Sequence, residues 1–382
     1  MLRGLRLWGA VVVAAAVPTM ASGQDPVPPA APTPSPADTP AIRVGATIFT
    51  NYTYQSNPEV ADSDGNMIHR SAFDVARAYI NVTGNISHTV AFRITPDLAR
   101  ENDPASSLSG SLEFRLKYAY LQVNLDDWLP AGSYARFGIQ QTPYLDYSEN
   151  IYQFRFEGTM FAERTGYFAS ADAGASFHLN FPGNYGDVHV GYFNGENYNK
   201  SELNDQKALM IRATARPFAA KSPLLRGLRT TIFYDGDHNV AHADRKRTIG
   251  QVTFEHKLGT VGVEYLDAHD QLSALPGSVD RHGTGYSVWA NPKGPGRWEE
   301  LIRYDHQTPD DRSVFAPAST APDLTTSLDS QKQNRLIVGV SYWFPHQGNV
   351  SSALMVDYDG QTFKNISTPP VHSVGVHALI NF

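Results

Sequence analysis

The side chains best suited to metal chemistry in this 382-residue chain are a group of histidines and carboxylates in its middle. His238 and His242 stand four residues apart, and Asp235, Asp237 and Asp244 lie close to them in the sequence. Imidazole and carboxylate groups are common zinc ligands. A solvated loop explains the same cluster more simply, because nothing in the sequence fixes a ligand geometry. We therefore expect no bound metal.

The sequence contains no complete motif for covalent or phosphate chemistry. Asp62–Gly65 and Asp235–Asp237 resemble fragments of calcium-binding loops, but neither has the glutamate that closes the full motif. A Gly-x-Ser-x-Gly elbow, a Walker loop and a dinucleotide fingerprint are absent. The lack of cysteine excludes disulfides and thiolate metal sites. We expect no enzyme and no cofactor, although a barrel hydrolase with a serine–histidine pair at its outer rim stays open.

The N-terminal part of the chain carries export signals. Two arginines precede the apolar run Leu7–Val17, and small residues follow it, which predicts a signal peptide over residues 1–23. The run is too short to span a bilayer as a helix. Residues 24–40 are rich in proline and predict an extended, disordered linker. The folded domain is expected over residues 41–382.

Short stretches of alternating residues dominate that domain. Near the C-terminus, Val374, Val376 and Ile380 share one face, while Gly375 and His377 share the other. A period of two is typical of strands with two different faces. No later segment reaches 18 consecutive apolar residues, so a membrane-spanning helix is not expected.

The connections between these stretches alternate in length. Seven are short and eight are long, counting Asp235–Lys246 as long and Gln141–Gly166 as the third long one. Fifteen connections join sixteen strands, and outer-membrane barrels have short periplasmic turns and long external loops. The sequence therefore predicts an all-β fold, a transmembrane antiparallel β-barrel of sixteen strands in the bacterial outer membrane.

A soluble β-sandwich is the competing fold, and aromatic residues at strand ends favour the barrel. Such residues form girdles at the two membrane interfaces. The last strand also ends on the aromatic Phe382. The predicted girdle residues are Tyr52, Tyr54, Trp128, Tyr144, Tyr192, Phe193 and Trp343.

Taking the more apolar face of each strand as lipid-facing assigns charged side chains to the lumen. An arginine on the lipid face costs about 2–4 kcal/mol near the membrane midplane. The acids assigned inward are Glu255, Glu264, Glu299 and Asp357. The predicted pore-lining arginines are Arg77, Arg93, Arg136, Arg212, Arg216, Arg229, Arg303 and Arg335.

One strand does not fit this assignment. Glu113, Arg115 and Lys117 fall on the same face as Ala119 and Leu121, which are predicted to face lipid. Either a bulge interrupts the strand near Tyr118, or its charged part projects beyond the membrane.

The net charge of −7 comes largely from acids in the long connections. External carboxylates commonly bind divalent ions that bridge lipopolysaccharide, so outer-membrane lipid and lipopolysaccharide are expected partners, and nucleic acid is not. We hypothesise a weakly anion-preferring lumen below an acidic surface. In the alternative, lumen arginines pair with lumen acids and leave no strong preference.

Four segments resemble the phosphate-selective porins O and P. They are RFGIQQTPY at Arg136–Tyr144, MFAERTGY at Met160–Tyr167, YFNGENYN at Tyr192–Asn199 and GRWEELIRYD at Gly296–Asp305. The resemblance implies a sixteen-stranded barrel, usually a homotrimer, whose third loop folds inward and narrows the pore. It also implies that the barrel assembly machinery reads the C-terminal strand ending in Phe382.

The third long connection is the expected constriction loop, and its charged residues include Arg155, Glu157, Glu163 and Arg164. The sequence predicts a porin that allows passive diffusion of small polar solutes or ions, including anions such as phosphate. The alternatives are a barrel enzyme and a structural or adhesive barrel with a plugged lumen.

Overall fold

The computed structural model describes residues 39–101, 105–202, 204–220, 222–276, 280–310, 332–346, 348, 350–364 and 368–382. The predicted signal peptide, residues 1–23, lies outside the described residues, and so does all of the predicted linker except residues 39 and 40. None of the described helices has the length and apolar character needed to cross a membrane.

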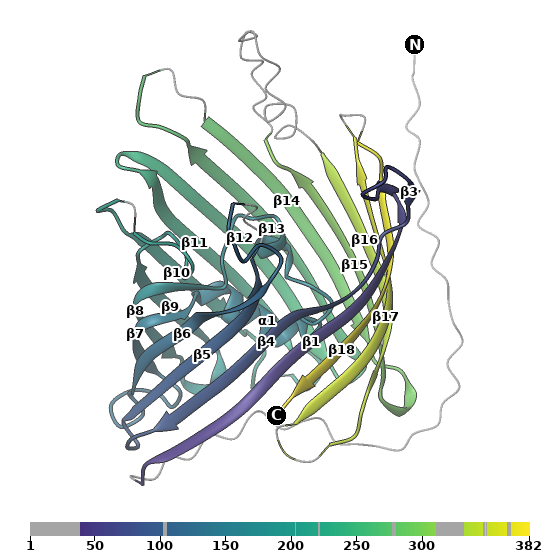
Figure 1. Ribbon diagram of the computed structural model, residues 1–382. Helices are drawn as coiled ribbons and strands as arrows, with labels where there is room; N and C mark the ends of the chain where they lie inside the picture. The colour runs from purple at the N-terminus through teal and green to yellow at the C-terminus, as the bar shows by residue number, and fades with distance from the viewer. Residues whose placement is uncertain are drawn as a thin grey trace, which may run out of the picture. The chain divides into compact units, whose positions relative to one another are not determined.

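Sixteen antiparallel strands of the described chain close into one barrel, which confirms the predicted fold class and strand number (Figure 1). Each strand pairs with its neighbour along the chain, and the last strand pairs with the first. The first eight are β1 (Ala41–Asn57), β4 (Ser71–Asn85), β5 (Val90–Arg100), β6 (Leu112–Asn124), β7 (Tyr134–Gln141), β8 (Ala171–Asn180), β9 (Gly186–Phe193) and β10 (Ala208–Ala215). The other eight are β11 (Leu228–Val240), β12 (Ala243–His256), β13 (Gly259–Gln271), β14 (Asp280–Pro292), β15 (Trp298–Thr308), β16 (Gln333–Trp343), β17 (Ser351–Phe363) and β18 (Val371–Asn381).

Small elements occupy several connections. A hairpin of β2 (Val60–Ala61) and β3 (Met67–Ile68) lies between β1 and β4. The 3₁₀ turns η1 (Pro182–Asn184) and η2 (Pro295–Arg297) precede β9 and β15.

The predicted alternation of short and long connections is wrong at two points. The connection from residue 216 to residue 227, predicted as short, is longer than the connections 272–279 and 364–370, which are predicted as long. The segment Asp235–Lys246, predicted as a long loop, belongs almost entirely to β11 and β12, and only residues 241 and 242 connect the two strands. His242 has a φ of 67°, a left-handed conformation that suits a tight hairpin turn. Polar residues make this segment resemble a loop in the sequence, although they continue the hydrogen-bonded ladder between β11 and β12.

The two faces of the strands differ as predicted. On the outer face, Val356, Val374 and Ile380 are 46–48% exposed. On the inner face, Asp357 and His377 are 4% and 7% exposed. Apolar residues therefore face outward, toward where lipid would lie, and polar residues face inward, as in a transmembrane barrel.

A bulge resolves the strand that the sequence left ambiguous. Thr95 on β5 pairs with Tyr118, whereas the next residue, Pro96, pairs with Leu116. Lys117 is therefore an extra residue on β6, and both Lys117 and Tyr118 are buried on the inner face, at 3% and 7% exposure. Proline cannot donate to the ladder, so it is commonly found at such interruptions. The bulge switches the parity of β6 and keeps the charged half of this strand on the lumen side.

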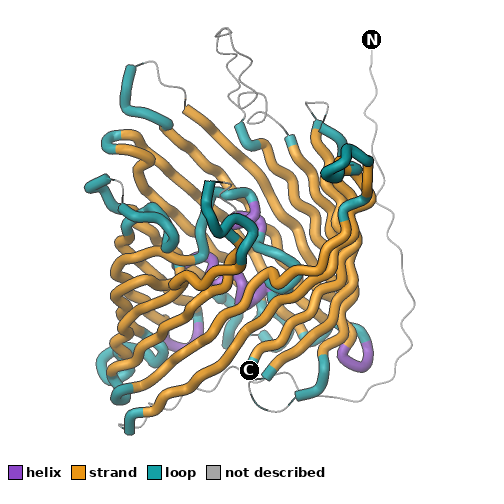
Figure 2. The backbone as a smooth tube through the Cα atoms, viewed as in Figure 1, coloured by secondary structure: helices purple, strands orange, loops and turns teal. Residues whose placement is uncertain are grey.

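The connection from residue 142 to residue 170 folds into the barrel, which confirms the predicted inward third loop (Figure 2). It contains α1 (Pro143–Tyr152) and α2 (Phe161–Arg164). Leu145, Phe154 and Phe161 of this loop are at most 2% exposed, and they belong to the same apolar cluster as residues of the barrel wall. Burying a large apolar side chain contributes roughly 1.5–3 kcal/mol, so this cluster holds the loop firmly against the wall.

This cluster also explains where the predicted aromatic girdle is wrong. Trp128 and Tyr192 are 66% and 59% exposed, as expected for girdle residues. Tyr144 and Phe193 are instead buried inside, and Trp343 packs against Phe154 with ring centroids 6.0 Å apart. The inward loop needs apolar partners within the barrel, and these aromatics supply them.

Candidate functional site: the passage beside the third loop

The third loop divides the lumen unequally. Its helix α1 packs against β9, β10 and β13. Between the loop and the strands β1, β4, β5 and β6 a cavity of about 340 Å³ remains. Its strand residues include Thr47, Phe49, Tyr79, Asn81, Arg93, Lys117 and Tyr118, and its loop residues include Asp146, Glu149, Asn150, Gln153, Arg155 and Phe156.

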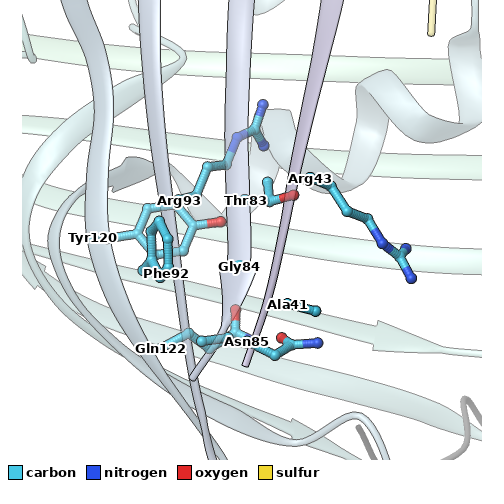
Figure 3. A pocket seen from close by; sticks show the side chains of 10 residues that line it. Ala41, Arg43, Thr83, Gly84, Asn85, Phe92, Arg93, Tyr120 and Gln122 are labelled. Atoms are coloured by element: carbon cyan, nitrogen blue, oxygen red, sulfur yellow. The ribbon is translucent and has the colours of Figure 1, made fainter. Parts of the chain in front are cut away.

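A second cavity of about 250 Å³ follows the same wall (Figure 3). It is lined by Arg43, Thr83, Asn85, Tyr120 and Gln122, among others. Arg93 lines both cavities, so the two adjoin at this side chain on the wall formed by β1, β4, β5 and β6, and the two cavities together are called the polar track below.

Two cations that line the 340 Å³ cavity have no described carboxylate as an ion-pair partner. The Arg93 guanidinium donates to Thr95 Oγ1 and Asn81 Oδ1 at 3.0 and 2.8 Å, and it lies 4.5 Å above the Tyr118 ring. Lys117 Nζ donates to the hydroxyl of Tyr79 at 3.1 Å. Hydroxyls, amides and ring faces stabilise these charges without neutralising them.

Most of the other predicted pore-lining arginines are neutralised by acids. Arg77 and Arg115 share the carboxylate of Asp97, at 2.7 and 3.3 Å. Two further pairs are Arg229 with Glu255 and Arg335 with Asp359. Arg136 is an intermediate case, since it donates to Gln122 at 2.9 Å and lies 3.8 Å from Asp146 on α1.

Several of these acids are absent from the inward acids that the sequence predicts, because polar residues make their strand ends resemble loops. Asp97 lies within β5 and is 0% exposed. Asp305 and Asp359 lie within β15 and β17. Asp187 belongs to β9 and binds Arg212. A strand that continues beyond the membrane keeps its parity, which is the signal that would have revealed them.

Arg212 and Arg303 are buried behind the third loop, at 3% and 1% exposure, so neither lines the described passage. Each donates to a loop carbonyl: Arg212 Nε to Pro143 O at 2.9 Å and Arg303 Nη1 to Thr159 O at 3.0 Å. Arg247, absent from the predicted set, donates to Tyr167 O at 3.4 Å. These contacts anchor the loop to the wall.

Arg216 lies just beyond the end of β10. Its guanidinium donates to Asn184 Oδ1 of η1 at 2.6 Å. This position is on the short-turn side of the barrel, away from the 340 Å³ cavity.

Charges within the third loop pair with one another. Arg155 contacts Glu149 at 2.8 Å and Glu163 at 3.1 Å, and Arg164 contacts Glu157 at 3.0 Å. Burial raises the pKa of Glu149, although the neighbouring Arg155 opposes that shift. All four predicted constriction residues therefore belong to internal salt bridges of the loop.

The candidate metal-binding and catalytic residues are not arranged as a metal site or as a hydrolase site in the described part of the chain. His238 lies 3.5 Å from Asp244, but the described part of the chain holds no group of three ligands suited to a metal. A serine–histidine contact does occur, with His346 Nε2 2.6 Å from Ser352 Oγ. It lies at the exposed short connection between β16 and β17, at the opposite rim from the one expected for a barrel hydrolase.

No protein-family model matches the sequence. No curated protein matches it either.

Solved structures resemble the fold at low sequence identity. An anion-selective porin from Comamonas acidovorans has 11% identity and a TM-score of 0.60 over 90% of this chain and 100% of its own. The outer membrane channel DcaP of Acinetobacter baumannii has 13% identity and a TM-score of 0.57 over 90% and 98%. OmpT of Vibrio cholerae, in a trimer form, has 14% identity and a TM-score of 0.54 over 90% and 100%. The chain thus has the sixteen-stranded fold of bacterial outer-membrane porins, in agreement with the predicted location.

Proposed function

We propose that this protein is a porin through which small polar solutes diffuse passively, and that it is not an enzyme. The observation that carries the proposal is the polar track beside the third loop, inside a closed barrel. A loop held by an apolar cluster and by wall arginines narrows such a channel without needing to move. Selectivity then comes from the width of the passage and the charges that line it.

We further propose a weak preference for anions. Arg93 and Lys117 face the track without a described carboxylate partner, and Arg43 lines its second cavity. Tight phosphate selectivity is not part of the proposal, because Arg155 and Arg164, the third-loop cations, are both bound to glutamates.

The proposed assembly is a homotrimer in the bacterial outer membrane, surrounded by lipid and lipopolysaccharide. The trimer form of the Vibrio cholerae protein supports this state by likeness of fold. The barrel assembly machinery would read the C-terminal strand, where the backbone of Phe382 pairs with that of Ala46 at 3.0 Å in both directions.

Planar-bilayer recording of the purified protein tests the proposal. We expect stepwise conductance in symmetric salt and a reversal potential of the anion-preferring sign across a salt gradient. Absence of conductance from correctly folded protein would favour a plugged structural barrel, and a clear cation preference would refute the proposed selectivity. Hydrolysis of ester or peptide substrates that disappears in a Ser352→Ala variant would refute the non-enzymatic assignment.

A further inference from the structure

The connection between β9 and β10 also lies against the barrel wall beside the third loop. Its residues 194–202 are described and are called the fourth loop below. Asn194 N donates to Ala173 O at 2.9 Å, and Tyr198 N donates to Ala171 O at 3.1 Å. The fourth loop therefore runs along the external end of β8, the strand that directly follows the third loop.

Gly195 fastens the fourth loop to the wall from two sides. Its N–H donates to Asp172 Oδ2 at 2.7 Å, and its carbonyl accepts a hydrogen bond from the guanidinium of Arg245. Arg245 also binds Asp237, and the carboxylates of Asp172 and Asp237 belong to residues that are only 1% and 3% exposed. Hydrogen bonds to charged groups are stronger than neutral ones, and exclusion of water strengthens them further. This set of contacts is called the Gly195 latch below.

Only glycine fits at the centre of this latch. Gly195 has a φ of 98°, a conformation that other residues rarely adopt. A Cβ at this position would also collide with the carboxylate of Asp237. Asp237 is held by Arg245, whereas Asn199 and Lys200 of the fourth loop are exposed. A side chain at position 195 should therefore displace the loop rather than the wall.

The side chain of Tyr198 projects from the fourth loop over the cations of β6. Its ring centroid lies 5.0 Å from Arg115 Cζ and 5.9 Å from Lys117 Nζ. Arg115 is already paired with Asp97. Lys117 has no described carboxylate as an ion-pair partner, so it is the cation whose charge Tyr198 can affect most.

Lys117 lies among three tyrosine rings. The ring centroids of Tyr79 and Tyr118 are 4.8 and 5.5 Å from its Nζ, and these two rings belong to the strands β4 and β6. The third ring, that of Tyr198, belongs to the fourth loop. A ring face attracts an ammonium group and occupies a side from which an anion could approach. With all three rings in place Lys117 is 3% exposed, and a movement of the loop would remove one of them.

We propose, on the basis of the channel function proposed above, that Tyr198 helps to determine the charge selectivity of the passage by covering Lys117, and that the Gly195 latch holds it there. With the latch closed, the ring shields the ammonium group, and the passage discriminates only weakly between anions and cations. With the fourth loop displaced, Lys117 meets the entering solutes, and the anion preference rises.

Reversal potentials of the full protein in planar bilayers across a salt gradient test the proposal. Tyr198→Ala should raise the ratio of anion to cation permeability about two- to fivefold, the size expected of one cation–π contact. Tyr198→Phe keeps the ring and should restore the wild-type ratio. An unchanged ratio in Tyr198→Ala, with the channels still conducting, would overturn the role of Tyr198 and leave the porin standing. Absence of conductance from the folded wild type would overturn the porin itself.

A second substitution separates charge from pore width. In a Lys117→Met background, Tyr198→Ala should lose most of its effect on the permeability ratio, because the covered ammonium group is gone. A shift of equal size in both backgrounds would mean that the ring acts through pore width, which would refute the proposal. Heat-modifiable gel mobility verifies that each barrel is folded. If Lys117→Met does not fold, Tyr198→Leu decides, since it keeps an apolar side chain without a ring face, and a wild-type ratio there would refute the proposal.

Gly195→Ala tests the latch. The collision with Asp237 should displace the fourth loop, so the permeability ratio should rise as it does in Tyr198→Ala. Gly65→Ala is the matched control, because Gly65 also has a positive φ, 85°, but a Cβ there would meet no atom within 4 Å. An unchanged ratio in Gly195→Ala, or an equal rise in Gly65→Ala, would overturn the assignment of the latch.

Discussion

Single arginines serve two different roles inside this barrel, according to what their guanidinium groups bind. Arg212 and Arg303 are buried and hold the backbone of the third loop. Arg93 faces the passage and is stabilised by neutral partners. Parity in the sequence predicts that all three face inward, but it contains no information about which ones the loop covers.

Replacing Arg303 tests the anchoring role. Arg303→Met leaves the carboxylate of Asp305 buried and unpaired, since the two are joined by bonds of 2.7 and 2.8 Å. Removing one partner of a buried pair costs about 3–5 kcal/mol, and we expect a loss of this size in the free energy of unfolding by urea. Single-channel recordings should also become noisier, because the loop loses its bond at Thr159. Arg335→Met is the control. Its pair with Asp359 is partly exposed, so the expected loss is at most about 1 kcal/mol, and an equal effect of the two variants would contradict the anchoring role.

The selectivity of the channel should change with pH through Glu149. Burial raises the pKa of this carboxyl, so acidification neutralises it before ordinary exposed carboxyls. Above its pKa the group is negative and opposes anions, and below it that opposition is lost. The reversal potential should therefore move toward stronger anion preference as the pH falls. At neutral pH, the reversal potential of Glu149→Gln should already have the more anion-preferring value, and it should not change further as Glu149 would titrate. A wild-type profile that matches the variant at every pH would contradict the assignment.

At the scale of elements, the strands were largely predictable and the loop contacts were not. Alternation of side chains and of connection lengths predicts sixteen strands, because the period of two is local to each strand. The sequence does not reveal the tight turn at residues 241 and 242. The strand ends on both sides of this turn are rich in polar residues, which are also typical of loops. The pairing of Arg77 with Asp97, and the burial of Arg303 under the third loop, depend on contacts between distant segments, which a single sequence does not display.

The bulge in β6 gives a prediction about strand register. Deleting Lys117 removes the extra residue, so Leu116 and Tyr118 become adjacent and still face Pro96 and Thr95 in an uninterrupted ladder. We expect this deletion to fold and to reduce anion preference. Its folding can be followed by heat-modifiable mobility and far-UV circular dichroism.

Deleting Val338 is the matched comparison. This residue lies in β16, whose pairing with both neighbours has no interruption. The deletion turns Arg335 to the lipid face, at a cost of about 2–4 kcal/mol if it lies near the midplane. Normal folding of this second deletion, or misfolding of the first, would show that register does not depend on the bulge as inferred.

At the scale of the whole molecule, closure of the barrel joins the two ends of the folded chain. β1 pairs with β18 over most of its length, from Thr47↔Asn381 to Asn57↔His372. Beyond this ladder, Phe382 adds two backbone bonds to Ala46, while its side chain is 61% exposed. The backbone of the last residue therefore extends the ladder that closes the barrel, whereas its ring makes little contribution to internal packing.

Replacing and deleting Phe382 separates these two contributions. Phe382→Ala retains both backbone bonds, so refolding of the purified protein into detergent micelles should match the wild type. Its amount in the outer membrane of cells should fall, because the assembly machinery loses the proposed aromatic signal. Deleting Phe382 also removes two hydrogen bonds of about 0.5–1.5 kcal/mol each, so refolding in micelles should weaken as well. Phe344→Ala is the matched control, because it removes a ring of the same kind that is 44% exposed just beyond the end of β16. Equal losses in cells for Phe344→Ala and Phe382→Ala would mean that the machinery does not read the terminal residue specifically, and barrel closure alone would then account for the position of Phe382.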